Sequence, residues 1–272
     1  MRDVPVTGRA PAPDLARGAA LLLIAVANAH TFVTHRGIGV RAYPLDPTGV
    51  DAWLAAAQLT LVDGRAYPLF ALLFGYGIAG LARRAARDGA GPDQVLALVR
   101  RRGGALFAVG AAHAVLLWHG DFVAAYGLIA VVLAPVLVRG STAVLVLTGV
   151  AATTLLALLY APVALTRSDA ASASPSLVAP DVLSAAVERF GEWLFGNLLI
   201  SAVGLLGAAV AGVLVARAGW LDAPARHRRA LRRVAVAGIG AGSWAACRWG
   251  WSPPGCGRRR SRWRSWSGCC TR

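Results

Sequence analysis

The sequence has 272 residues, of which 57% are hydrophobic and only 15% are charged, with 31 glycines in addition. A soluble domain has roughly 45–50% apolar residues with glycine included and about 25% charged residues. A disordered chain is therefore excluded, and a soluble globular enzyme is not expected. The formal net charge is +15, and all 28 basic residues are arginine. These arginines form short clusters between long apolar runs instead of one soluble basic face, which argues against nucleic-acid binding.

Long apolar runs predict an all-α, polytopic membrane protein with six to seven transmembrane helices, since a spanning helix needs about 20 mainly apolar residues. The predicted spans are Leu15–Val33, Ala66–Ala82, Gly103–Trp118, Phe122–Val138, Thr142–Leu165 and Trp193–Ala216, with a weak seventh from Val234. A surface or half-buried helix is expected at Asp51–Val62, followed by a break at Asp63–Arg65, and Ser168–Pro180 is expected to form a loop. Small residues around Gly75 and Gly212 predict close helix packing.

Arginine clusters orient the predicted helices. Arg83–Arg102 contains six arginines and two aspartates, and residues 217–233 contain six arginines and one aspartate. Cytoplasmic loops of membrane proteins carry an excess of basic residues, and a cytoplasmic N-terminus places every arginine cluster on that side. We therefore expect a multi-pass protein of the inner (plasma) membrane. A secretory signal peptide at residues 1–29 is the alternative interpretation of the N-terminal apolar run.

The last 26 residues, Cys247–Arg272, differ in composition from the rest of the chain. They contain only Arg, Trp, Cys, Gly, Ser, Pro and one Thr, and they include all four cysteines. We interpret residues 1–246 as one transmembrane helical domain and residues 247–272 as a frameshifted or disordered tail, because a GC-rich gene read out of frame yields this composition. The alternative is a genuine Arg/Trp-rich tail that binds anionic lipid. The cysteine spacing indicates neither a metal site nor a disulfide framework.

Few ionisable or amide side chains fall within the predicted spans, so each is a candidate functional group. Asn28 and His113 are expected at similar depth in the outer half of the membrane, where they could share one pocket. Asp121 stands above His113 in a tight outer turn that begins at Trp118, and His119 in the same turn is expected to be solvated. Structural roles are the alternatives: His113 and Asn28 as links between helices, Trp118 as an interfacial anchor and Asp121 as a helix cap. No P-loop, zinc-helix motif, nucleophile elbow or dinucleotide fingerprint is present, and no metal site is predicted.

Three stretches together resemble a known family. They are Pro13–Ala20, Gly64–Gly77 and Arg100–Gly127, and the third contains His113 and the turn Trp118–Asp121. This pattern resembles the YeiB-like family of bacterial inner-membrane proteins, which carries a domain of unknown function and is similar to the wider group of transmembrane acyltransferases. The first 130 or so residues carry the resemblance. Family members are usually longer, so this chain is expected to be truncated relative to the family.

The resemblance implies transfer of an acyl group from a cytoplasmic donor, such as an acyl-CoA, to an extracytoplasmic sugar or similar acceptor. His113 would act as base or nucleophile, Asp121 would orient the imidazole, and Asn28 would polarise a carbonyl. The candidate substrate-binding residues are Arg17, Arg101, Arg102, Trp118 and Tyr126. A transporter or another non-enzymatic membrane protein is the alternative, with the same polar groups lining a pathway. No cofactor is expected beyond the acyl donor; the expected partners are the lipid bilayer and a small-molecule or glycan substrate, with the oligomeric state left open.

Overall fold

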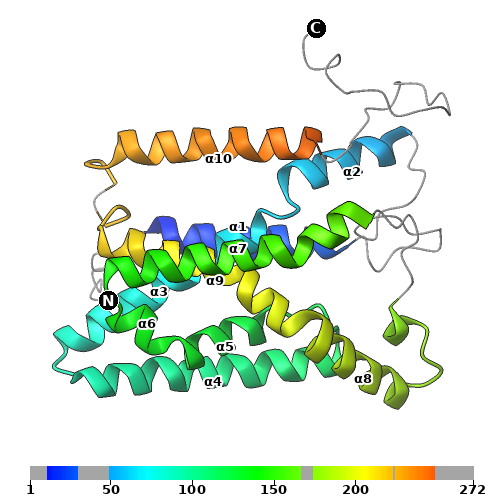
Figure 1. Ribbon diagram of the computed structural model, residues 1–272, viewed down its shortest axis with the longest axis horizontal. Coiled ribbons are helices and arrows are strands. Elements are labelled where there is room, and N and C mark those ends of the chain that lie inside the picture. The colour runs from blue at the N-terminus through cyan, green and yellow to red at the C-terminus, as the bar shows by residue number, and fades with distance from the viewer. Residues whose placement is uncertain (1–10, 30–48, 167–173, 223, 249–272) are drawn as a thin grey trace, which may run out of the picture.

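The computed structural model describes residues 11–29, 49–166, 174–222 and 224–248. All regular structure in these ranges is helical (Figure 1), which confirms the all-α class. The α-helices are α1 (Pro11–Ala29), α2 (Gly49–Leu61), α3 (Ala66–Arg87), α4 (Pro92–Leu116), α5 (Val123–Val132), α6 (Ala134–Arg139), α7 (Thr142–Thr166), α8 (Val182–Gly191), α9 (Leu199–Arg217) and α10 (Arg228–Arg248). A short 3-10 turn, η3 (Pro175–Leu177), precedes α8, and a π-helical segment, η4 (Glu192–Leu198), joins α8 to α9.

Within the described residues, three helices are long and apolar enough to cross a membrane by length and composition: Ala66–Arg87, Thr142–Ala161 and Val182–Arg217. The second of these is covered least, since only 11% of its most apolar window is buried inside the protein. Large apolar side chains stand exposed on it, among them Leu147 and Leu158. Soluble monomers rarely expose such a continuous apolar surface, so these helices indicate a membrane protein.

The helices α3 and α9 form the centre of the bundle and contact one another backbone to backbone. A Cβ atom on Gly75 would overlap the carbonyl group of Ala209, and one on Gly212 would overlap that of Leu72. Small residues permit this approach, as predicted for Gly75 and Gly212. Figure 1 shows α2 and α10 along one side of the bundle and α4 and α5 along the opposite side, with α1, α3, α7 and α9 between them.

The third predicted span begins earlier in the chain than expected. Helix α4 starts at Pro92, not at Gly103. Proline suits the first helical position because the amide N–H it lacks would have no intrahelical partner there, and the Gln94 side chain accepts a hydrogen bond from the Gly91 amide at 2.8 Å. The arginines at 100–102 therefore lie on the helix and not in a connecting loop.

The prediction of one continuous span at Phe122–Val138 is wrong, because the segment divides at Leu133 into α5 and α6. Pro135 is the cause, since it has no N–H to donate to the carbonyl of Val131 four residues earlier. The Arg100 side chain satisfies that carbonyl from α4, with Nε 3.2 Å from the Val131 oxygen. Arg100 on α4 thus compensates the carbonyl that is left without a helix partner where α5 ends.

The remaining boundaries follow the predictions in part. The helix expected at Asp51–Val62 is confirmed as α2, as is the break after it, with Gly64 adopting a φ of +71° in the turn before α3. The sixth predicted span, Trp193–Ala216, is the C-terminal part of the longer helix Val182–Arg217. The end of the first predicted span beyond Ala29 and the tail beyond Arg248 lie outside the described residues.

Candidate functional site

His113 lies in the last turn of α4, which contacts α8 (Figure 1), and Asp121 follows in the turn after this helix. The helix ends in a tight turn, in which the amides of Leu117 and Trp118 both donate to the carbonyl of His113 at 2.9 and 3.0 Å. This turn reverses the chain, so Asp121 returns to the level of His113.

His113 and Asp121 form the first pair of the site. The Nδ1 atom of His113 lies 2.9 Å from Oδ2 of Asp121, although the angle at the nitrogen falls outside that of a regular hydrogen bond. The carboxylate is only 2% exposed, whereas the imidazole is 41% exposed. Because Nδ1 is buried against the carboxylate, the accessible edge of the ring is the one that carries Nε2. A carboxylate at Nδ1 fixes the tautomer and orientation of a histidine.

Asp121 also accepts a hydrogen bond from the start of the following helix, as its interpretation as a helix cap predicts. Its Oδ1 accepts a hydrogen bond from the Ala124 amide at 2.8 Å, at the start of α5. Burial raises the pKa of the Asp121 carboxyl above its ordinary value, and this increase is opposed by the Ala124 hydrogen bond and by His113. The Ala124 amide and His113 thus favour the ionised carboxylate, while burial favours the neutral acid.

His119 and Glu192 form a second pair, which sequence reasoning missed. Nδ1 of His119 lies 3.0 Å from Oε2 of Glu192, and the two side chains are 21% and 16% exposed. The expectation that His119 is solvated is therefore wrong, because α8 and η3 fold over the turn. Ser176 holds the carboxylate, with its Oγ donating to Oε2 at 2.6 Å and its amide donating to Oε1 at 3.4 Å. Burial lowers the pKa of His119, an effect that Glu192 opposes and that Arg189 reinforces.

Asn197 joins the two pairs. Its Nδ2 donates to the backbone carbonyls of His119 at 3.2 Å and Asp121 at 2.9 Å, and its Oδ1 accepts from Ser201 Oγ at 2.8 Å. Asn197 and Glu192 both lie in the π-helical segment η4, and such segments occur frequently at functional sites. The signal that could have identified Asn197 is an amide within a predicted span.

Asn28 and Tyr126 belong to a neighbouring aromatic cluster. Asn28 donates to the hydroxyl of Tyr67 at 2.6 Å and to the carbonyl of Ile24 at 2.8 Å. Tyr126 is 3% exposed, and its hydroxyl donates to the Tyr67 carbonyl at 3.3 Å. Phe122 stacks on Tyr67, with ring centroids 4.2 Å apart. The structure thus gives Asn28 and Tyr126 packing partners on α1 and α3, and it does not bring them into the His113–Asp121 pair.

The predicted arginines lie far from His113. Arg101 and Arg102 are exposed on α4, roughly 16–18 Å along the helix from His113 at a rise of about 1.5 Å per residue. Arg17 pairs with Asp14 at 2.8 Å and donates to the Leu73 carbonyl at 3.1 Å, which links α1 to α3. Trp118 stays beside the site, with its ring centroid 5.9 Å from that of His119.

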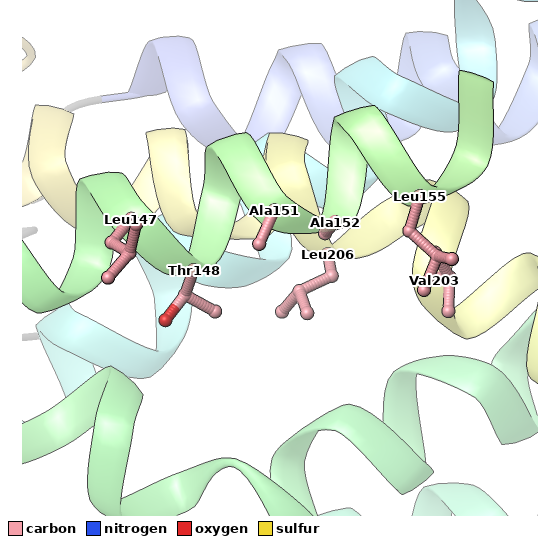
Figure 2. A pocket seen from close by; sticks show the side chains of 7 residues that line it. All are labelled: Leu147, Thr148, Ala151, Ala152, Leu155, Val203 and Leu206. Carbon is pink, nitrogen blue, oxygen red and sulfur yellow. The ribbon is translucent and has the colours of Figure 1, made fainter. Parts of the chain in front are cut away.

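A shallow groove of about 390 Å³ lies between α7 and α9, away from the polar pairs. Figure 2 shows its lining: Leu147, Thr148, Ala151, Ala152, Leu155, Val203 and Leu206. Its single hydroxyl, on Thr148, donates to the Val144 carbonyl at 2.8 Å. The groove is therefore apolar surface without an acid, a base or a free nucleophile.

The comparisons with known proteins give no match. No family model matches this chain, and no curated protein or solved structure matches it either. Among the described residues, no three or more His, Cys, Asp or Glu side chains are grouped to hold a metal ion.

Proposed function

We propose that this chain is an acyltransferase-like integral membrane protein of the YeiB-like type, which transfers an acyl group to a hydroxyl of an extracytoplasmic acceptor. The observation that carries the proposal is the contact between His113 Nδ1 and Asp121 Oδ2 at 2.9 Å, with the carboxylate buried and the imidazole half exposed. A buried carboxylate beside a histidine can orient the imidazole as a general base and stabilise its protonated form.

In the proposed reaction, Nε2 of His113 removes the proton of the acceptor hydroxyl. The resulting alkoxide attacks the acyl carbonyl of the donor, and the tetrahedral intermediate expels the leaving group. The protonated His113 then returns its proton to that leaving group, a thiolate if the donor is a thioester. The His113 side chain is 41% exposed and its Nδ1 is buried against the carboxylate, so Nε2 is the nitrogen that would meet the acceptor. The buried charge of Asp121 stabilises the imidazolium in between.

The proposal includes a multi-pass arrangement with six to seven spans and a cytoplasmic N-terminus. The arginines of α4 and of the segment after α9 would then face the cytoplasm, where Arg101 and Arg102 would bind the phosphates of the donor. Since these arginines are roughly 16–18 Å from His113 along α4, the acyl portion of the donor has to extend into the membrane. Reporter groups at Ala90 and Val178 should therefore be accessible from opposite sides of the membrane.

The test is acyl transfer by the full chain in proteoliposomes. A radiolabelled acyl-CoA is supplied on the side of the membrane that carries the N-terminus, and a sugar acceptor is supplied on the opposite side. His113→Ala should lower the rate at least 100-fold, because general-base catalysis contributes about 10²–10⁴-fold. Asp121→Asn should lower it at least tenfold. His227→Ala is the matched control, because this histidine stacks on Trp220 after α9 and should leave the rate unchanged.

Full acyl transfer by the His113→Ala protein would refute the mechanism. Accumulation of a solute by proteoliposomes without any acyl donor would favour the transporter alternative. A half-exposed His113 beside a buried carboxylate also suits that alternative, because such a pair can carry a proton.

A further inference from the structure

The second histidine pair extends to a serine. Oγ of Ser174 lies 3.5 Å from Nε2 of His119, and Nδ1 of the same ring lies 3.0 Å from Oε2 of Glu192. The two ring nitrogens therefore face a hydroxyl on one side and a carboxylate on the other. Serine, histidine and an acid in this order form the arrangement that activates a serine nucleophile, and the serine contact is often loose in the absence of substrate.

We propose that Ser174, His119 and Glu192 form a nucleophilic triad that takes up an acyl group from a thioester or an activated ester as a covalent acyl-serine. The proposal goes beyond the proposed function, because it assigns covalent chemistry to a residue that the His113 mechanism does not use. It also concerns a site on different elements: the turn after α4 supplies the base, and the segment from Ser174 through η4 supplies the nucleophile and the acid.

The carboxylate of Glu192 is held in place as the orienting group. It accepts the Ser176 hydroxyl at 2.6 Å and faces His119 with the same oxygen, while the Ser176 amide lies 3.4 Å from the other oxygen. These contacts hold the carboxylate 3.0 Å from Nδ1 of His119, although the angle at this nitrogen, as at His113, falls outside that of a regular hydrogen bond. The triad requires the tautomer with the proton on Nδ1, which leaves Nε2 to act as the base toward Ser174. The backbone of His119 is fixed in turn by Asn197.

The surroundings of His119 favour its neutral form, which a base requires. Burial and the positive charge of Arg189 both lower the pKa of the imidazole, and Glu192 opposes them. Arg189 is itself held near the turn, because its Nε donates to the Val115 carbonyl at 2.7 Å. Ser174 is half-buried, and the proposal requires a donor to reach its hydroxyl.

The covalent step balances as follows. The Ser174 hydroxyl gives its proton to Nε2 of His119 while its oxygen attacks the acyl carbonyl, and the bond from that carbonyl to the leaving group breaks. The leaving thiolate or alkoxide takes the proton from His119. A hydroxyl acceptor or water then attacks the acyl-serine, gives its proton to His119, and releases Ser174, which recovers the proton.

The experiment is active-site labelling of the full-length protein in detergent with a fluorophosphonate probe, which needs neither an acyl donor nor an acceptor. The adduct is mapped by mass spectrometry of the peptides, so the wild-type protein alone locates the reactive serine. We expect the adduct on Ser174. We expect Ser174→Ala to abolish it, His119→Ala to lower the labelling rate at least 100-fold, and Glu192→Gln to lower it at least tenfold.

The matched control is Ser184→Ala, which removes a serine hydroxyl that donates to Asp181 at 2.7 Å. Its labelling rate should remain within twofold of wild type. Each variant is first shown to be folded by size-exclusion chromatography and thermal unfolding. A folded wild-type protein that forms no adduct, or forms it on a serine other than Ser174, would overturn the triad. Absent labelling together with His113-dependent acyl transfer would remove the triad and leave the proposed function standing.

Discussion

Replacing Gly110 by alanine should separate α4 from α5 and disturb the His113–Asp121 pair. A Cβ atom at this position would lie 2.6 Å from Oδ1 of Asp121 and 2.7 Å from Cα of Ala124, where ordinary contact begins at 3.4 Å. The start of α5 would have to move away by roughly 1 Å, because overpacked side chains and backbone shift to relieve such contacts. Gly104, on the same helix, has nothing within 4 Å of its Cβ position and is the matched control.

The magnitude follows from two opposing effects. Alanine gains up to about 1 kcal/mol over glycine inside a helix, and this gain applies to both positions. Overpacking by one methyl group costs roughly 1–3 kcal/mol, and this cost applies to Gly110 alone. The free energy of unfolding of Gly110→Ala should therefore be about 1–3 kcal/mol lower than that of Gly104→Ala, because the helix gain cancels in the comparison.

The assay is equilibrium unfolding of the detergent-solubilised protein, followed by tryptophan fluorescence, with both variants measured beside wild type. Because the new methyl group presses on Asp121, Gly110→Ala should also reduce His113-dependent acyl transfer, whereas Gly104→Ala should retain it. Equal unfolding free energies for the two variants would show that α4 and α5 do not pack as closely as described, and the reasoning would fail.

Three further predictions concern the polar groups. Asn197→Ala should lower the free energy of unfolding by about 1–3 kcal/mol, because the carbonyls of His119 and Asp121 lose a donor; an unchanged thermal midpoint would contradict this. Since the folded protein depresses the pKa of His119, fluorophosphonate labelling should rise with pH with a midpoint below the ordinary value of 6.5; a midpoint above it would contradict burial of the ring. Arg139→Gln should change the free energy of unfolding by less than about 1 kcal/mol, because the ion pair between Arg139 and Asp93 at 2.7 Å is solvent-exposed. A larger loss of unfolding free energy in a denaturant titration would refute this prediction.

Much of the helical arrangement could be predicted from apolar runs and breakers. The turn at Gly64 and the helix over Thr142–Thr166 follow from local sequence, since glycine permits a positive φ and a long apolar run without charges favours a single helix. The division at Leu133 was missed, although Pro135 was visible in the sequence. Proline in a membrane helix can be accommodated when another group donates a hydrogen bond to the freed carbonyl. Here that group is Arg100 on α4, and its contact with Val131 joins two helices.

The candidate site could be predicted only in part. His113 and Asp121 were identified as rare polar groups near one membrane face, and their contact follows from the tight turn that connects them. Glu192 and Ser174 were not identified, because they lie 73 and 55 residues after His119 and reach it only through the folding of α8 over the turn. Asn28 was expected near His113, but the rotation of α1 about its axis points it toward Tyr67 instead.

The sequence by itself determined the helical class, the apolar character of the spans and the polar residues that stand out within them. These properties depend on composition and on periodicity along the chain, which act locally. Only the tertiary structure decided which polar groups meet, because the rotation and depth of each helix are set by side-chain packing at close contacts such as Gly75 with Ala209. For that reason the contact between His113 and Asp121 could be inferred from the short turn that joins them. The contact between His119 and Glu192 could be seen only in the packed helix bundle.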